Sequence, residues 1–444
     1  MKFIKNIIMI IKGNNPNRTV VLGYFLYVLI GSLLLLLPFF EKIPIKYLDN
    51  LFIATSAVST TGLATISISD CYNFWGQLIV IILIQLGGIG YMTLGSFIIL
   101  AITDKIDLSR NVMHKYVLSI PEHINTRKII KIIICYTFIV EFIGTIFLFV
   151  FFKIAKVSNA LWSAIFHSVS AFCTAGFSLY NNSLESFHRN IGINFTISVL
   201  CILGSIGFII VYDIWNESIK EKRSITLTSK IILRSTFLLI TLGTIVLFFF
   251  EPIIIRETFF ERMLTSFFQS MTSLTTAGFN TIPISNLTML SYLVITMLMI
   301  IGASPSGTGG GLKTTTFTTL IGVMKSSLKG EKDVRFLNRT IPNERVWLAI
   351  SSLFFYLTLL FISTFPLFLK DNRFLFHQVL FEVASALGTV GLSTGITQQL
   401  NNFEKIIIII TMFIGRIGPL SFGISLFLKK RPNLIKYPTE DLAI

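Results

Sequence analysis

The chain has 444 residues, of which 53% are hydrophobic and only 13% are charged. A mean hydropathy of +0.77 excludes an ordinary soluble protein of about two to four domains and predicts a polytopic membrane protein instead. The net charge of +15 would suit a nucleic-acid partner, but the placement of the basic residues, described below, favours a signal for membrane orientation.

The first predicted elements are a polar tail over residues 1–18 and an apolar span over 19–39. This span is too long for the apolar core of a signal peptide, and it matches a bilayer core of about 30 Å. A short helix over 47–58, a turn and a second span over 74–103 follow. Because a helix of about twelve residues is only about 18 Å long, the short helix is predicted to be re-entrant.

The same order of span, short helix, turn and span recurs three more times. The sequence therefore predicts an all-α membrane protein of four such repeats in a pseudo-fourfold arrangement, with eight transmembrane helices. The repeats are predicted at 19–128, 129–230, 231–344 and 345–429, with a tail over 430–444. Their short helices are predicted at 160–172, 258–273 and 375–387, and the spans after the first repeat at 129–152, 191–214, 231–250, about 290 onward with a break, 345–369 and 403–428.

Each short helix leads into a turn of small residues built on one glycine, and these glycines recur at intervals of roughly 110 residues. Non-helical backbone at membrane depth is tolerated where it is buried in protein or lines a watery cavity. Glycine lets successive carbonyls point to one side, and the helix end before each turn favours a cation. Because no carboxylate lies in any turn, the pattern favours a large monovalent cation over Ca²⁺.

We therefore predict an ion filter of backbone oxygens, with close helix packing by small residues as the alternative. The predicted filter residues are Ser59, Thr60, Thr61 and Gly62, then Cys173, Thr174, Ala175 and Gly176, then Thr275, Thr276, Ala277 and Gly278, then Gly388, Thr389, Val390 and Gly391.

A polar, glycine-rich break at 302–313 interrupts the second span of the third repeat. It fits an intramembrane gating loop below the filter, and a packed kink is the alternative. A phosphate-binding loop is disfavoured because Leu312 stands where that motif needs its second glycine. A charge inside a span is costly and usually faces a pore or partner, which makes Arg416 a candidate for the cytoplasmic half of the pathway. The predicted gate residues are Gly302, Gly307, Gly309, Gly310, Gly311, Lys313 and Arg416.

The basic residues gather in the N-terminal tail, in the linkers between repeats and after the last span. By the positive-inside rule, this places both termini in the cytoplasm and argues against nucleic-acid binding. We find no set of residues at catalytic spacing, so the sequence predicts that the protein is not an enzyme. A membrane NTPase acting through the loop at 302–313 is the alternative from another class.

These motifs resemble the Trk/Ktr/HKT superfamily of potassium transporters, and most closely its bacterial KtrB-type membrane subunits. The likeness is carried by the four turns and by residues 274–283, 302–313 and 415–419. It implies potassium as the transported ion at the filter, location in the bacterial plasma membrane, a homodimer, and a cytosolic KtrA-like regulatory ring that alone binds nucleotide. Several Ktr relatives depend on Na⁺, so the resemblance also raises Na⁺ dependence. The alternative function is an obligate K⁺/H⁺ or K⁺/Na⁺ symporter with alternating access.

Overall fold

The computed structural model describes residues 16–90, 93, 126–219, 225–331, 333–368 and 373–427. Most of the predicted tail over 1–18, most of the end of the span over 74–103, and the tail over 430–444 lie outside these residues. The described residues form helices joined by loops, with one short antiparallel hairpin of β1 (Arg335–Phe336) and β2 (Arg339–Thr340).

The first half of the described chain contains the following helices. They are α2 (Pro16–Leu35), α3 (Tyr47–Val58), α4 (Ile68–Cys71), α5 (Phe74–Ile89), α8 (Thr126–Ile154), α9 (Ala160–Phe172), α10 (Ile191–Ser205) and α11 (Phe208–Ile219), with short 3-10 turns η1 (Pro38–Phe40) and η2 (Glu185–Phe187).

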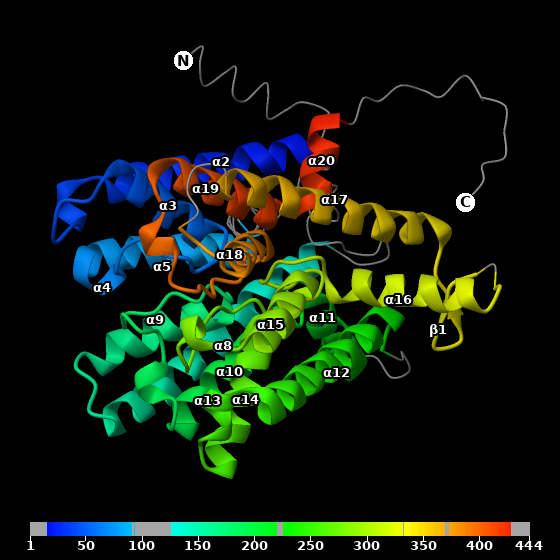
Figure 1. Cartoon of the computed structure of the whole chain (residues 1–444), viewed down its shortest axis with the longest axis horizontal. Helices are drawn as coiled ribbons and strands as arrows, with labels where there is room; N and C mark the ends of the chain where they lie inside the picture. The colour runs from blue at the N-terminus through cyan, green and yellow to red at the C-terminus, as the bar shows by residue number, and fades with distance from the viewer. Residues whose placement is uncertain are drawn as a thin grey trace.

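The second half of the chain continues in the same way. Its helices are α12 (Leu227–Phe250), α13 (Pro252–Ile255), α14 (Phe259–Leu274), α15 (Met289–Ile301), α16 (Thr314–Leu328), α17 (Asn343–Phe368), α18 (Phe376–Gly388), α19 (Asn402–Ile417) and α20 (Pro419–Phe427), with 3-10 turns η3 (Ile284–Asn286) and η4 (Thr397–Gln399). In Figure 1, α3, α4 and α9 lie at one end of the long axis, and β1 lies at the other.

Four of the described helices, α2, α8, α12 and α17, are long and apolar enough to cross a membrane. Large apolar side chains project from three of them, with Phe142, Phe237 and Phe361 exposed by 68%, 75% and 64%. Such exposure would be unfavourable in water over a large patch but suits contact with lipid.

Two of the predicted spans are not continuous. The spans expected at 191–214 and 403–428 are the pairs α10–α11 and α19–α20, which are bent by 84° and 95°. Each bend contains a glycine with positive φ, Gly207 at 96° and Gly418 at 91°. That conformation ends an α-helix, and Pro419 directly after Gly418 cannot donate a backbone hydrogen bond that would extend it. With the bent pairs counted, up to six described spans pass the length and composition test.

Candidate functional site

The four short helices α3, α9, α14 and α18 end in the same local conformation. The residue before each turn glycine donates its N–H to the carbonyl five residues earlier, at 2.8 to 2.9 Å, which is the long bond of a Schellman cap. Thr60, Thr174, Thr276 and Thr389 occupy the left-handed position of this cap, with φ between 49° and 55°. A β-branched residue rarely takes this conformation, and strain of this kind is typically held at functional sites.

The four turn glycines also have positive φ, and each packs its α-carbon against the backbone of another turn. A Cβ added at any of them would clash with a carbonyl oxygen one turn further along the chain, and the fourth glycine returns to the first turn. The pairs are Gly62 with Ala175, Gly176 with Ala277, Gly278 with Val390, and Gly391 with Thr61. The turns at 59–62, 173–176, 275–278 and 388–391 thus form a closed ring of backbone, called the ring from here on.

The first residue of three of the turns has a polar side chain with a hydrogen-bond partner, and the fourth is Gly388. Ser59 Oγ lies 2.6 Å from Thr61 Oγ1, and Thr275 Oγ1 donates to the Met271 carbonyl at 2.7 Å. Cys173 Sγ contacts Gln85 Oε1 at 3.5 Å. The predicted filter residues are therefore brought together through their backbones, while these three side chains bond within their own turn, to the preceding helix or to α5.

On one side of the ring lies a polar cavity of about 570 Å³. The four turn glycines line it together with hydroxyl and amide side chains such as Thr65, Ser178, Asn181 and Gln398. Asn181 also donates to Asp70 at 2.9 Å. This hydrogen bond, and a further one from Ser67, lower the pKa of Asp70 and keep a negative charge close to the mouth of the cavity.

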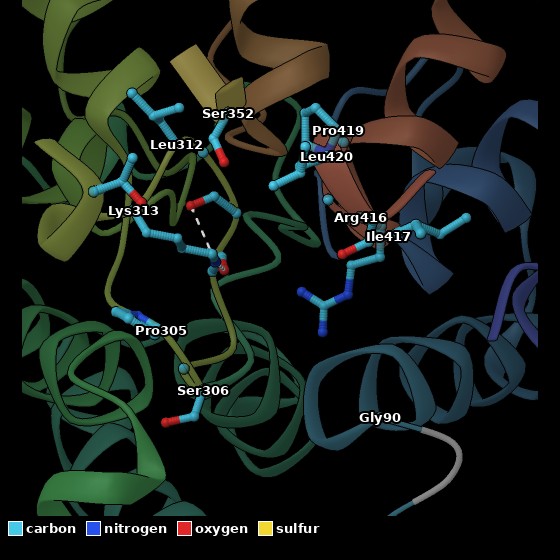
Figure 2. A pocket seen from close by; sticks show the side chains of 18 of the residues that line it. Gly90, Pro305, Ser306, Leu312, Lys313, Ser352, Arg416, Ile417, Pro419 and Leu420 are labelled. Carbon is cyan, nitrogen blue, oxygen red and sulfur yellow. Dashed lines mark hydrogen bonds between the residues drawn. The ribbon is translucent and has the colours of Figure 1, made fainter. Parts of the chain in front are cut away.

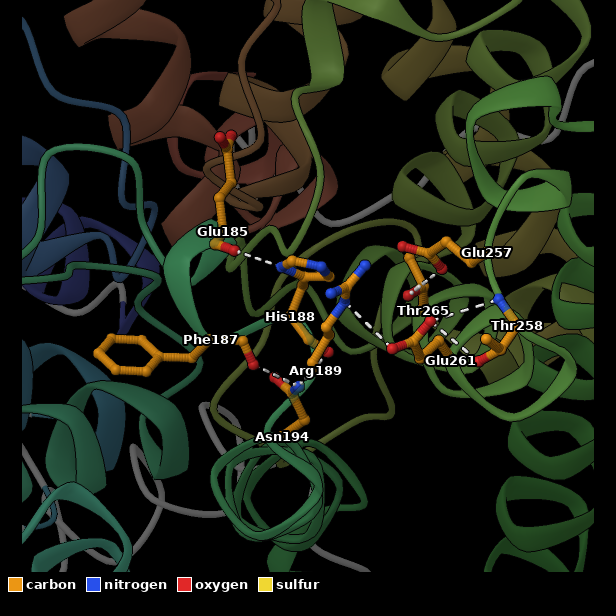
Figure 3. Close-up of polar contacts among 9 residues, drawn as sticks. All are labelled: Glu185, Phe187, His188, Arg189, Asn194, Glu257, Thr258, Glu261 and Thr265. Carbon is orange, nitrogen blue, oxygen red and sulfur yellow. Dashed lines mark hydrogen bonds and ion pairs between the residues drawn. The ribbon is translucent and has the colours of Figure 1, made fainter. Parts of the chain in front are cut away.

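The loop after the second turn also contacts the start of α14, the helix that leads into the third turn, as Figure 3 shows. Arg189 Nε lies 3.1 Å from Glu261, an ion pair that is largely exposed on the arginine side. Asn280 donates to Glu185 at 2.8 Å, and burial raises the pKa of Glu185. The exposed pair contributes little to stability, so the amide contact is the firmer link between the loops after the second and third turns.

On the opposite side of the ring lies a cavity of about 300 Å³, lined by the glycine-rich loop at 302–313 and by the α19–α20 bend. The loop folds back on itself, because Ala303 N donates to the Gly310 carbonyl at 3.1 Å. The α-carbons of Gly302 and Gly311 meet with no room for a side chain. Gly307 packs just as closely against the carbonyl of Ser205, at the end of α10.

The loop reaches all four left-handed threonines of the ring. The Thr308 carbonyl lies 3.4 Å from Thr60 Oγ1, and the Thr308 hydroxyl lies 3.1 Å from Thr174 Oγ1. Gly310 N donates to Thr276 Oγ1 at 3.0 Å. A Cβ at Gly310 would clash with Thr389 Oγ1, which has no hydrogen-bond partner among the described residues. The loop therefore covers this face of the ring.

Two cationic side chains point into the same cavity (Figure 2). Arg416 Nη1 donates to Thr60 Oγ1 at 2.9 Å and to the Thr308 carbonyl, and Nη2 donates to carbonyls of Gly87 and Gly88. Lys313 Nζ donates to the Gly309 carbonyl at 2.6 Å. No Asp or Glu is among the described residues that line this cavity, so both cations are held by neutral oxygens.

Sequence reasoning missed Thr308, which contacts the first and second turns of the ring. The available signal was that Thr308, a β-branched residue, interrupts the glycines of the segment 307–311. A bulky side chain in the middle of a glycine run indicates a packed position.

Comparisons with known proteins agree along nearly the whole chain. The family model TrkH, described as a cation transport protein, matches residues 13–433. The Ktr system potassium uptake protein B of Vibrio alginolyticus is 33% identical over 440 residues, covering 97% of this chain and 95% of that protein. The potassium/sodium uptake protein NtpJ of Enterococcus hirae is 33% identical over 444 residues, 98% of each. The crystal structure of the potassium transporter TrkH from Vibrio parahaemolyticus shares the fold, with a TM-score of 0.72 at 19% identity, covering 92% of this chain and 84% of that one.

Proposed function

The chain belongs to the TrkH family of cation transport proteins, and from this premise we propose that it takes up potassium across a bacterial plasma membrane through the ring. The observation that carries the proposal is the closed contact of four glycine turns, each on a strained left-handed threonine. Rings of backbone oxygens replace the hydration shell of K⁺ in selective pores. The proposal includes four span, re-entrant helix and span repeats around one axis, with eight crossings and both termini in the cytoplasm.

The glycine-rich loop and Arg416 are proposed as the gate. Support comes from the polar contacts of the loop with Thr60, Thr174 and Thr276, and from the fixed positive charge of Arg416 beside the same face. A positive charge next to a cation path raises the barrier to passage. Opening then requires the loop to leave the threonine hydroxyls and the arginine to move with it.

A regulatory partner and a homodimer complete the proposal. The names of the relatives mark them as components of a Ktr system, which supports a cytosolic KtrA-like ring that binds nucleotide and acts on the gate. One relative is named a potassium/sodium uptake protein, which supports Na⁺ dependence. An obligate K⁺/H⁺ or K⁺/Na⁺ symporter is the alternative, and the reversal potential separates the two, since only obligate coupling makes it follow the second ion.

The decisive experiment replaces Gly278 by Ser, because a side chain there would clash with the Val390 carbonyl. We expect reduced discrimination between Rb⁺ and Na⁺ in uptake assays, in a host that lacks its own potassium uptake systems. Gly330→Ser is the matched control, since Gly330 also has positive φ but no atom lies within 4 Å of its added Cβ. If Gly278→Ser reaches parental abundance and keeps the parental selectivity, the ring is not the selectivity filter.

A further inference from the structure

For each turn of the ring, a polar side chain of the short helix bonds to the non-helical segment that follows the turn. In three turns this side chain stands nine residues before the turn glycine. His167 Nε2 lies 3.0 Å from Ser178 Oγ, Gln269 donates to Thr281 at 3.1 Å, and Glu382 accepts from Ser393 at 3.0 and 3.1 Å. The first turn uses Asp49 instead, which accepts from Thr65 at 2.7 Å. We call these four side chains the props.

The second prop, His167, has a defined tautomer. Its Nδ1 lies 2.7 Å from the Ser163 carbonyl, and because a carbonyl can only accept, Nδ1 carries the hydrogen. Nε2 then accepts from the Ser178 hydroxyl. The imidazole of His167 is fully buried and stacks on the side chain of Tyr180, with 5.0 Å between the centres of the two aromatic groups.

The fourth prop, Glu382, is a fully buried carboxylate. It accepts from the hydroxyls of Ser393 and Thr397, and within the described part of the chain no lysine or arginine pairs with it. A buried carboxyl group without a cation is costly compared with a neutral amide of the same shape. Its two hydroxyl donors both come from the segment that follows the turn, so that cost is offset only while this segment stays in place.

The position of the props ties them to the ring. Ser178 and Ser393 each stand two residues after a turn glycine, Gly176 and Gly391, whose backbones touch the neighbouring turns. A shift of either serine would therefore move a ring contact. Since the contacts run in chain order around the ring, the second and fourth turns lie opposite each other.

We infer that Glu382 and His167 are positioning residues that set ion selectivity, because their hydrogen bonds hold the segments that follow two opposite turns of the ring. The inference deepens the proposed function and rests on it. The ions meet backbone oxygens, and the props fix how far apart those oxygens stand.

The test measures the Rb⁺/Na⁺ uptake ratio of the full chain in membrane vesicles. We expect Glu382→Ala to lower this ratio about tenfold, the effect of losing a buried hydrogen bond to a charged group. Glu382→Gln keeps an acceptor oxygen and should stay within about threefold of the parent. Ser393→Ala removes the donor from a half-buried position and should also lower the ratio, as should His167→Phe, which retains the packing.

The matched control is Glu251→Ala. Glu251 is also fully buried and accepts from Thr288 Oγ1 at 2.9 Å, and none of its hydrogen bonds within the described residues goes to a turn of the ring. An equal loss of selectivity in this control would overturn the inference, because any buried carboxylate would then serve.

Two further outcomes are decisive. The inference is overturned if Glu382→Ala or Ser393→Ala reaches parental abundance and keeps the parental Rb⁺/Na⁺ ratio. If Glu382→Ala does not reach the membrane, the result for Ser393→Ala alone decides. Gly278→Ser is run in the same assay. If Gly278→Ser is the only variant with a lower Rb⁺/Na⁺ ratio, the inference about the props is wrong and the proposed function stands. If Gly278→Ser also keeps the parental ratio, the proposed function is wrong.

Discussion

Arg416 donates through Nη1 to the hydroxyl of Thr60 at 2.9 Å, although the two residues are 356 positions apart. The Thr60 hydroxyl in turn donates a hydrogen bond to the Ser59 carbonyl at 2.7 Å. The same arginine nitrogen donates to the Thr308 carbonyl. One side chain from α19 therefore holds both the first turn of the ring and the loop that covers it, so loop and ring can respond together.

Replacing Arg416 by Ala should raise basal Rb⁺ uptake. Each hydrogen bond from a charged group contributes about 1.5–3 kcal/mol, so the loss of even one favours the open state about tenfold. Arg416→Lys should give an intermediate uptake rate, since lysine keeps the positive charge but lacks the two donor nitrogens of the planar guanidinium. Initial uptake rates at matched membrane abundance give the result, with the exposed Arg189→Ala as control. Parental rates in Arg416→Ala would exclude a gating role.

Thr308→Val tests the latch between loop and ring. The change keeps the volume but removes the hydroxyl that contacts Thr174 Oγ1 and the Phe172 carbonyl, each at 3.1 Å. We expect a several-fold rise in basal uptake, since about 1 kcal/mol is lost for a neutral hydrogen bond, and restoration by Thr308→Ser. The control is Thr358→Val, because Thr358 is exposed and its hydroxyl donates to the Phe354 carbonyl of its own helix. If valine and serine at 308 behave alike, the hydroxyl is not the latch.

Much of the local structure could be predicted from the sequence. The short helices expected at 47–58 and 160–172 coincide with α3 and α9, and those at 258–273 and 375–387 differ from α14 and α18 by one residue at each end. These segments were readable because an amphipathic helix that stops at a small-residue turn is a local signal. Hydropathy carried no such signal at Gly207 and Gly418, where the apolar pattern continues through a bend.

The contacts of the candidate site depend on pairs that no local pattern encodes. Thr308 and Thr60 are 248 positions apart, and Ser304 reaches the Ser205 carbonyl across 99. Such partners become neighbours only when the four turns close on one another. Composition could nominate the glycines and Arg416, because each is unusual inside an apolar span, but it could not say which oxygen each would meet.

Gly310→Ala tests whether the loop must lie against the ring. Gly310 does not have positive φ, so the effect is one of space alone: an added Cβ would clash with Thr389 Oγ1 and the Gly388 carbonyl. Overpacking of this kind costs about 1–3 kcal/mol and should push the loop off the ring. We expect raised and less regulated uptake relative to Gly330→Ala. Reduced uptake with normal abundance would contradict the model, because it would mean that the displaced loop blocks the path.

Cys173→Ser should leave transport within about twofold of the parent, although Cys173 lies in a predicted filter turn. Its sulfur contacts residues outside the ring, 3.5 Å from Gln85 Oε1 and 3.8 Å from Glu141 Oε1, and a serine hydroxyl can donate to either of these oxygens. The ring contact of this turn is made by the backbone of Ala175 and Gly176. The check is the Rb⁺/Na⁺ uptake ratio and the rate at low external K⁺. A loss of selectivity in Cys173→Ser would mean that side chains, and not only peptide oxygens, define the path of the ion.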